Sequence, residues 1–254
     1  MQIRPGIELA NLTDVGCQRS ENEDYYCYAE PDSDEEFKTH GRLAVVADGM
    51  GGHAAGQVAS GLAVDVVRRT YLSSPSPNLP ETLIEAFRNA HHAIQRRSEE
   101  YPELQGMGTT CTAVVLRASE VHFAHVGDSR LYLIRDSHIS RLTNDHSMVN
   151  RLLEEGAITP EEAAVHPERN VLTAALGMSS QLPADFSEAP VPVRAEDVLL
   201  LCTDGLHGLV ADGELLTVTT ECRPQEACRT LVEMARQRGA PDNVTLQVIR
   251  IVSS

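Results

Sequence analysis

Tryptophan is absent from the 254-residue sequence, and aromatic residues make up only 4% of it. Proteins that hold single-stranded nucleic acid stack its bases on aromatic side chains, so few such platforms can form here. Basic residues are also few: 21 lysines and arginines stand against 37 aspartates and glutamates, a formal net charge of −16. An acidic surface repels phosphate backbones and anionic lipids. We therefore expect no nucleic-acid partner.

Cysteine pairs and long apolar runs are missing as well. The six cysteines form no CxxC pair and no zinc-binding spacing. No apolar run reaches the roughly 18 residues of a transmembrane helix, and no signal peptide is recognisable. We expect a cytoplasmic monomer without membrane insertion, whose reduced cysteines pack mostly as small hydrophobic residues.

Hydrophobic periodicity predicts a mixture of helices and strands. Amphipathic helices are expected over residues 55–72, 79–100 and 224–239, and short helices within 146–170. Segments rich in Val, Leu, Ile, Tyr or Thr predict strands at about 23–29, 42–47, 109–118, 120–126, 130–135, 197–203 and 244–252. A short link between the third and fourth strands indicates an antiparallel hairpin. The pattern favours a layered α+β fold.

Four aspartates stand at the ends of strongly apolar segments, each beside glycine or asparagine. Asp48 and Asp204 each precede a glycine, Asp128 follows one, and Asp242 precedes Asn243. A single Asp-Gly pair is usually only a turn. Four such positions suggest a shared purpose, because rigid strand ends fix carboxylates in space while glycine lets backbone carbonyls approach a ligand.

Clustered carboxylates repel one another unless cations lie among them. The acidity of the chain has two explanations: a solvated acidic surface, or carboxylates held together by divalent ions. Oxygen ligands select hard cations such as Mg²⁺ or Mn²⁺. Two such ions can activate a shared water for in-line displacement at phosphorus, which is what a phosphatase requires.

A phosphate monoester also needs a cationic partner. The stretch TDVGCQRSENEDYY supplies Arg19, followed closely by Glu23 and Asp24. Arginine presents a planar fork that matches phosphate oxygens. Alone, an arginine beside acids is most often a surface ion pair, so its meaning depends on the other motifs.

These motifs together resemble the metal-dependent protein phosphatase family, protein phosphatase 2C-like, and above all its bacterial Ser/Thr phosphatases. The resemblance rests on TDVG..R.ENEDYY, VVADGMGGHAAG, GMGTTCTAVVL, AHVGDSRLYLIR, LTNDHSMVNRLLEEGAITPEEAAVHPERNVLTAALG, LLLCTDGLHGLV and GAPDNVTLQVI. They cover nearly the whole chain in order. The resemblance implies one domain over residues 1–254 with an α+β fold, a four-layer αββα sandwich whose two central antiparallel sheets are flanked by helices.

The resemblance also implies two Mn²⁺ or Mg²⁺ ions, and a weaker third ion in bacterial members. Asp48 would bridge the first two ions, and the Gly49 carbonyl would join one of them. Asp204 and Asp242 would hold the other, and Glu23 would lie near the second ion through water. Asp128, with Asp204, would hold the third.

Arg19 matches the family's phosphate-binding arginine. Some members carry a histidine directly after the Asp-Gly pair, proposed to protonate the leaving alkoxide. This chain has Met50 there and its histidine at His53. His53 and a metal-bound water are both possible donors. Residues 146–170, with Met148 and Asn170, correspond to the family's mobile flap beside the active site, a candidate for substrate selection.

Other histidines carry weaker signals. His146, in NDHS, could suggest a metal motif, but without partner histidines at matching spacing we favour a loop leading into the flap. His91 and His92 lie on a predicted amphipathic helix and are expected to be packing or surface residues.

The sequence thus predicts a serine/threonine phosphatase that hydrolyses phosphoserine and phosphothreonine with a water activated by two Mn²⁺ or Mg²⁺ ions. The expected partners are phosphorylated proteins, namely targets of a bacterial Ser/Thr kinase and the kinase itself. Two alternatives stay open: an inactive family member that binds phosphoproteins as a regulatory module, and a phosphatase for a small phosphorylated metabolite.

Overall fold

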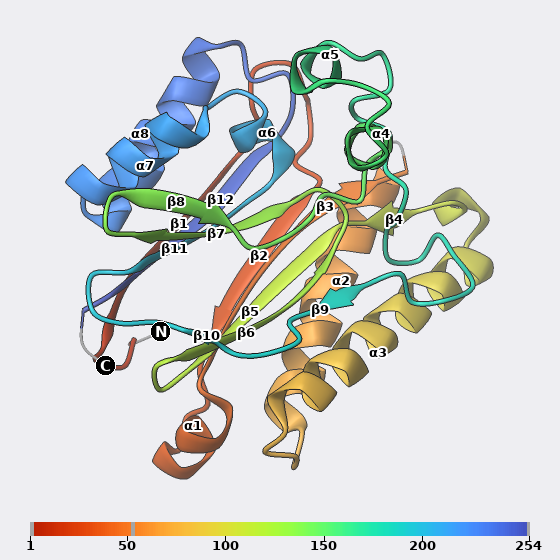
Figure 1. Ribbon diagram of the computed structural model, residues 1–254. Helices are drawn as coiled ribbons and strands as arrows, with labels where there is room; N and C mark the ends of the chain where they lie inside the picture. The colour runs from red at the N-terminus through yellow and green to blue at the C-terminus, as the bar shows by residue number, and fades with distance from the viewer. Residues whose placement is uncertain (1–2, 52–53, 253–254) are drawn as a thin grey trace.

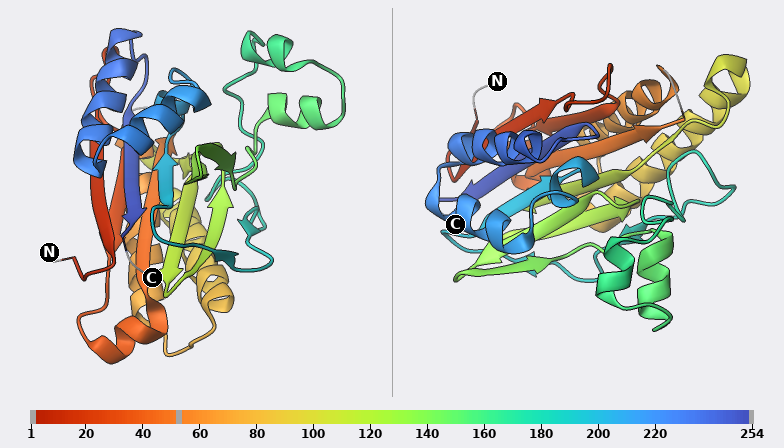
Figure 2. Two further views of the ribbon diagram at one scale, coloured as in Figure 1. Left: turned by 60° about the vertical axis from the view of Figure 1, so that its left-hand side comes forward. Right: turned by 90° about the horizontal axis from the view of Figure 1, so that it is seen from above.

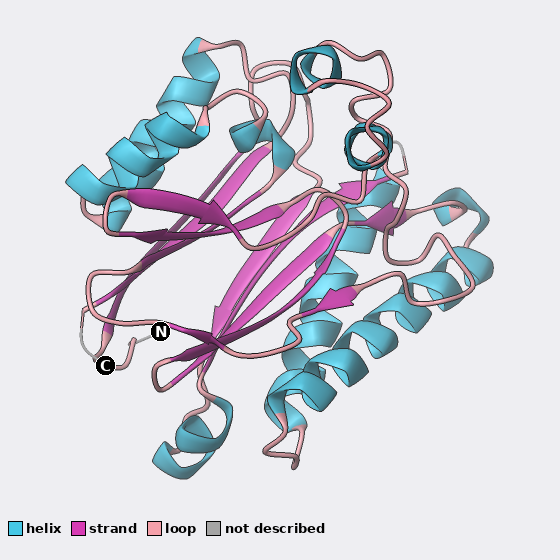
Figure 3. Ribbon diagram, viewed as in Figure 1, coloured by secondary structure: helices cyan, strands magenta, loops and turns pink. Residues whose placement is uncertain are grey.

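Two antiparallel sheets lie face to face, with helices on both outer sides (Figures 1 and 3). They belong to a computed structural model that describes residues 3–51 and 54–252. The five-stranded sheet has the order β1 (Ile7–Asp14), β12 (Val244–Ile251), β11 (Val198–Cys202), β7 (Arg130–Arg135) and β8 (His138–Arg141).

The seven-stranded sheet is built around β3. Its main path runs through β10 (Val191–Pro192), β6 (Glu120–Val126), β5 (Cys111–Arg117), β3 (Arg42–Met50) and β2 (Asp24–Ala29). Two short strands lie beside this path, β4 (Gly108–Thr109) against β3 and β9 (Asp185–Phe186) against β6. Every pairing in both sheets is antiparallel.

Helices cover the outer face of each sheet. Against the seven-stranded sheet lie α2 (Ala54–Ser73) and α3 (Leu79–Glu100), and against the five-stranded sheet lie α7 (Asp212–Glu221) and α8 (Pro224–Gln237). The shorter helices are α1 (Asp34–His40), the 3₁₀ turn η1 (Pro102–Leu104), α4 (Met148–Glu154), α5 (Pro160–Ala164) and α6 (Asp204–His207). The segment with α4 and α5 stands away from the sandwich (Figure 2).

Three apolar cores separate the four layers. Leu199 and Leu201 of β11 face the other sheet, whereas Leu200, between them, packs with Leu231 of α8. Because side chains alternate along a strand, a strand buried on both faces is apolar throughout. This explains the unbroken run VLLLC in β11.

The expected α+β sandwich is confirmed. The predicted strands are present, although the one expected at 109–118 is interrupted at Thr110. The helix expected to reach residue 239 ends at Gln237. The sequence analysis missed elements that are short or half-exposed: α1, η1, α6, α7, β1, β8, β9 and β10. All six cysteines are free, and three of them are buried. None of the helices in the described ranges is both long and apolar enough to cross a bilayer.

Truncating the core between the sheets should destabilise the protein. Leu201 is fully buried there, so we expect Leu201→Ala to lower the free energy of unfolding by about 2–5 kcal/mol. Chemical denaturation would measure it. The control is Val252→Ala, because this side chain is 41% exposed and should cost less than about 0.5 kcal/mol. Equal effects of the two substitutions would contradict this assignment of the core.

Candidate metal centre and active site

An open cavity of about 540 Å³ lies where strand ends of both sheets meet. Asp48 comes from β3 of one sheet, whereas Asp204 follows β11 and Asp242 precedes β12 of the other. Six acids line it, and apart from the exposed Glu21 we call them the acidic cluster: Glu23, Asp48, Asp128, Asp204 and Asp242. Side chains far apart in the sequence thus share one cavity, as a metal centre requires.

Close backbone packing explains the glycine after each of two aspartates. A Cβ on Gly49 would lie 2.0 Å from the carbonyl oxygen of Gly56, and one on Gly205 would lie 1.9 Å from that of Asn243. No larger residue fits at such distances. The Asp-Gly pairs therefore serve a close backbone approach at the cavity, and Asp48 is fixed further by hydrogen bonds with Thr110.

Asn243 ties the Arg19 loop to the start of β12. Its Oδ1 accepts a hydrogen bond from the Glu23 N–H (2.8 Å), and its Nδ2 donates to the carbonyl oxygens of Val15 (2.9 Å) and Glu21 (3.0 Å). These three bonds hold the loop beside the cavity.

The sequence analysis assigned no role to Asp24, which belongs to the same centre. Asp24 is buried, pairs with Asp48 in the β2–β3 register, and accepts a hydrogen bond from the Thr203 hydroxyl at 2.9 Å. Its Oδ1 has no hydrogen-bond partner. The available signal was a second acid beside Glu23 at the start of an apolar strand, where a buried charge needs a partner.

Burial and mutual repulsion raise the pKa values of four acids at this centre, Asp24, Asp48, Asp128 and Asp204. Desolvation is the largest cause in each case, followed by nearby carboxylates for most of them. The pKa is raised to about 7 for Asp24, to about 8 for Asp128 and to about 6 for Asp204, and that of Asp48 lies well above its usual range. The ionised cluster is therefore unfavourable on its own and is stabilised by added positive charge.

Divalent cations fit this cluster. Asp24 Oδ1 and Asp204 Oδ1 are buried without a hydrogen-bond partner, and cations would satisfy such oxygens. Across residues 3–51 and 54–252, no three His, Cys, Asp or Glu side chains lie so that they could together hold a metal ion. Mg²⁺ usually keeps several waters and takes only one or two protein carboxylates, so an open arrangement suits such an ion.

Arg19 is the cation at the edge of the cavity. Its Nη2 donates to Asp242 Oδ2 at 2.7 Å, and half of its side chain is exposed. Arg19 thus forms the ion pair that the sequence analysis considered, and the acid that it binds belongs to the acidic cluster. This contact holds the guanidinium beside the cavity with the rest of its fork available to an anion.

Two of the remaining predicted residues lie in the flap, and the third is His53. Asn170 lines the cavity, together with Leu172 and Met178, which the sequence analysis did not single out. Met148 begins α4 and is not among the lining residues. His53 lies outside the described residues.

Comparison with known proteins shows the family to which this chain belongs. The family model "Protein phosphatase 2C" matches residues 29–245. A serine/threonine protein phosphatase, PstP, from Mycobacterium tuberculosis is 38% identical over 247 residues, which cover 97% of this chain and 45% of that protein. The chain thus spans about half the length of this relative.

Two further similarities extend over nearly whole chains. Protein phosphatase PhpP of Streptococcus pneumoniae is 34% identical over 251 residues, which cover 96% of this chain and 97% of that protein. The crystal structure of the PstP catalytic domain in complex with two manganese ions superposes with a TM-score of 0.84 at 35% identity, covering 98% of this chain and 99% of that one.

The sandwich with its acid-lined cavity is thus similar in structure to a serine/threonine phosphatase domain that binds two manganese ions. The chain belongs to the protein phosphatase 2C family and resembles its bacterial Ser/Thr members.

The raised pKa values predict how the stability of the metal-free protein depends on pH. An acid whose pKa is higher in the folded state than in the unfolded chain favours folding below the unfolded pKa, and this contribution is lost as pH rises through the folded pKa. For Asp24, Asp128 and Asp204 the loss extends from about pH 4 to about pH 8.

Thermal unfolding in chelator should therefore give a melting temperature that falls over this range. Mn²⁺ should raise the melting temperature more at pH 8 than at pH 5.5, because ionised carboxylates bind it better. Asp24→Asn removes one buried charge, so it should lessen the decline in chelator. A metal-free melting temperature that rises between pH 5.5 and 8 would contradict these shifts.

Proposed function

We propose that this chain is a serine/threonine protein phosphatase that hydrolyses phosphoserine and phosphothreonine in other proteins. The convergence of the acidic cluster and Arg19 on one open cavity carries this proposal. The names of the relatives PstP and PhpP, both protein phosphatases, support it. The natural substrates would be targets of a bacterial Ser/Thr kinase, with the kinase itself among them.

The acidic cluster would bind the metal ions, and Arg19 would bind the substrate phosphate. Asp48, Asp204 and Asp242, with the Gly49 carbonyl, would hold two Mn²⁺ or Mg²⁺ ions, and Glu23 would contribute through water. When bound, these ions would lower the pKa of a water and supply the nucleophile for hydrolysis. Asp128 would hold a third ion with Asp204.

Arg19 would bind the phosphoryl oxygens and orient the ester for in-line attack. The leaving alkoxide takes up a proton, and His53 is the candidate donor from the protein. The chain needs no covalent intermediate, because water is the nucleophile.

A substitution in the acidic cluster distinguishes an active phosphatase from a binding module without activity. We expect Asp48→Asn to lower kcat/KM for a phosphothreonine peptide by at least about a hundredfold in saturating Mn²⁺, since metal stabilisation of the transition state contributes several kcal/mol. The control is Glu85→Gln on the exposed face of α3. A wild-type protein that binds the phosphopeptide in ample Mn²⁺ but releases no phosphate would instead be a binding module.

Arg19 gives a second test. Arg19→Ala should lower kcat/KM about 10- to 100-fold, because it removes a charge-assisted hydrogen bond to phosphate. Arg19→Lys should restore only part of the loss, since a lysine keeps the charge without the fork. Activity assays with a phosphopeptide and with a small phosphorylated metabolite would also judge the metabolite alternative. Unchanged kcat/KM in Arg19→Ala would remove this residue from the phosphate site.

A further inference from the structure

His146 joins three segments at the root of the flap. Its backbone N–H donates to the Gly127 carbonyl at 2.7 Å, and its carbonyl accepts from the Thr173 N–H at 2.8 Å. Its side chain connects Gly127 with a third segment: Nδ1 lies 3.3 Å from the Gly127 nitrogen, and Nε2 lies 3.0 Å from Asp185 Oδ2. All four polar atoms of this residue are used.

The hydrogen bonds define the tautomer. A backbone N–H can only donate, so Nδ1 of His146 accepts from Gly127 and carries no hydrogen. The hydrogen of the neutral ring is then on Nε2, which donates to Asp185. Both ring nitrogens are therefore engaged by the protein, and the metal motif considered for NDHS is not formed by this ring.

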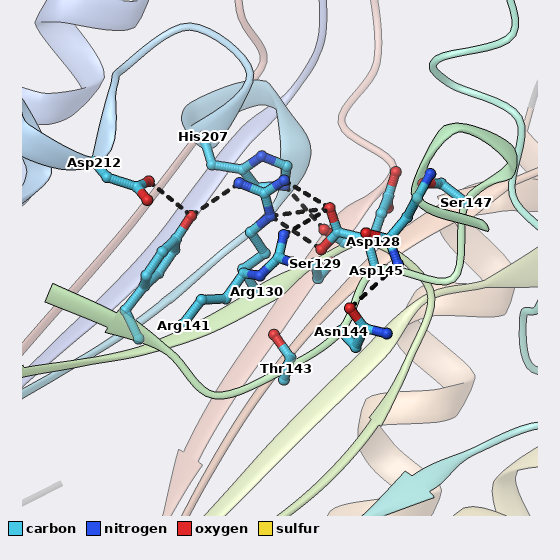
Figure 4. A network of polar contacts seen from close by, with 12 residues as sticks. Asp128, Ser129, Arg130, Arg141, Thr143, Asn144, Asp145, Ser147, His207 and Asp212 are labelled. Carbon is cyan, nitrogen blue, oxygen red and sulfur yellow. Dashed lines mark hydrogen bonds and ion pairs between the residues drawn. The ribbon is translucent and has the colours of Figure 1, made fainter. Parts of the chain in front are cut away.

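The Gly127 end of this bridge borders a member of the acidic cluster. Asp128 follows Gly127 directly, and its carbonyl accepts from His207 Nε2 at 2.9 Å. On the other side, Arg130 binds Asp145, the neighbour of His146, through both Nε and Nη2 (Figure 4). The chain before and after Asp128 is thus anchored to residues 145 and 146.

The Gly127 backbone has little freedom to adjust. Its φ is +102°, and a Cβ there would lie 2.5 Å from Thr110 Cγ2. The Ser129 hydroxyl is paired with the Thr110 hydroxyl at 2.7 Å, and Thr110 itself bonds Asp48. A shift of the Gly127 backbone would therefore also move Asp128, because the contacts with Thr110, Asp145 and His146 keep the rest of the turn from adjusting.

The bond from His146 to Asp185 joins the two ends of the chain segment that contains the flap. Asp185 is the first residue of β9 and lies 39 positions after His146. The chain between them contains the flap and the cavity-lining residues Asn170, Leu172 and Met178. The His146–Asp185 contact fastens the two ends of this segment together.

We infer that His146 is a positioning residue that acts through two separable bonds. The bond from Gly127 to Nδ1 sets the turn that carries Asp128 and so tunes cation binding there. The bond from Nε2 to Asp185 fastens the base of the flap and so sets the walls that a phosphoprotein meets. This inference rests on the proposed role of Asp128 as an ion ligand.

Two substitutions separate the bonds. His146→Asn keeps an acceptor near the position of Nδ1 but cannot reach Asp185, whereas His146→Gln reaches towards Asp185 but offers Gly127 no acceptor at the Nδ1 position. His146→Ala removes both, and Asp185→Ala removes only the flap bond. His92→Asn, on the exposed face of α3, is the matched control, and thermal melting verifies that each variant folds.

Mn²⁺ binding, followed by electron paramagnetic resonance of the free ion, tests the first bond without turnover. We expect His146→Ala and His146→Gln to weaken the weakest Mn²⁺ site about tenfold, the lower end of the loss seen when a ligand's own hydrogen-bond partner is removed, because His146 acts on Asp128 through Gly127. His146→Asn and His92→Asn should bind like wild type. Wild-type Mn²⁺ affinity in His146→Ala, or no rescue in His146→Asn, would overturn the role at Asp128.

Limited trypsin digestion at the flap arginines and steady-state kinetics test the second bond. Asp185→Ala and His146→Asn should be cleaved several-fold faster and show a raised KM for a phosphopeptide, with kcat and the KM for a small aryl phosphate unchanged. Cleavage at the wild-type rate would overturn the flap role. A wild-type protein without phosphatase activity would contradict the proposed function alone, since Mn²⁺ binding and digestion still judge this inference.

Discussion

Repulsion among buried carboxylates is the constraint on which this structure depends. The five acids of the acidic cluster and the neighbouring Asp24 carry six negative charges when ionised, and Arg19 offsets one of them. Two divalent cations would offset four more. The protein must hold these groups together before the cations arrive, and the cost in stability appears in the raised pKa values of Asp48, Asp128 and Asp204. The packing of the rest of the fold holds the acids in place and offsets this loss of stability.

The packing that places the acids is the contact between the two sheets. Asp48 belongs to one sheet and Asp204 and Asp242 flank strands of the other, so the spacing of the sheets sets the distances between the acids. Apolar packing fills the interface, and polar bonds fix its alignment. The buried Gln247 of β12 donates to the carbonyl oxygens of Val45 and Cys27 in the opposite sheet. A buried donor must find its partner, so such bonds oppose sliding of one sheet over the other.

The sequence predicted those parts whose pattern is strong and local. The helix over 79–100 has the expected bounds because its buried residues recur at helical spacing, and the strand over 120–126 has them because it is an almost wholly buried segment that ends before Gly127. The edge strand β1 was missed, since Asn11 and Thr13 are polar and half-buried and interrupt the apolar positions that begin with Ile7, so no clear alternation results. The convergence of the aspartates could be expected only from repeated strand ends and family resemblance. Asp24 was given no role because its position beside an apolar strand is only a weak signal, and its contact with Thr203 of the second sheet appears only in the structure.

An acidic protein repels a phosphorylated substrate, and the position of Arg19 provides a local positive charge that offsets this repulsion at the cavity. A net charge of −16 repels a phosphorylated protein at long range, while screening confines that repulsion to about 8 Å at physiological salt. Within that distance the local charges decide. Arg19 is bound to Asp242 and half-exposed, so an arriving phosphate meets a guanidinium already oriented and only partly neutralised. The carboxylate that we propose as a cation ligand, Asp242, thus also holds the arginine in place, and under the proposed function one side chain would link substrate binding to the metal centre.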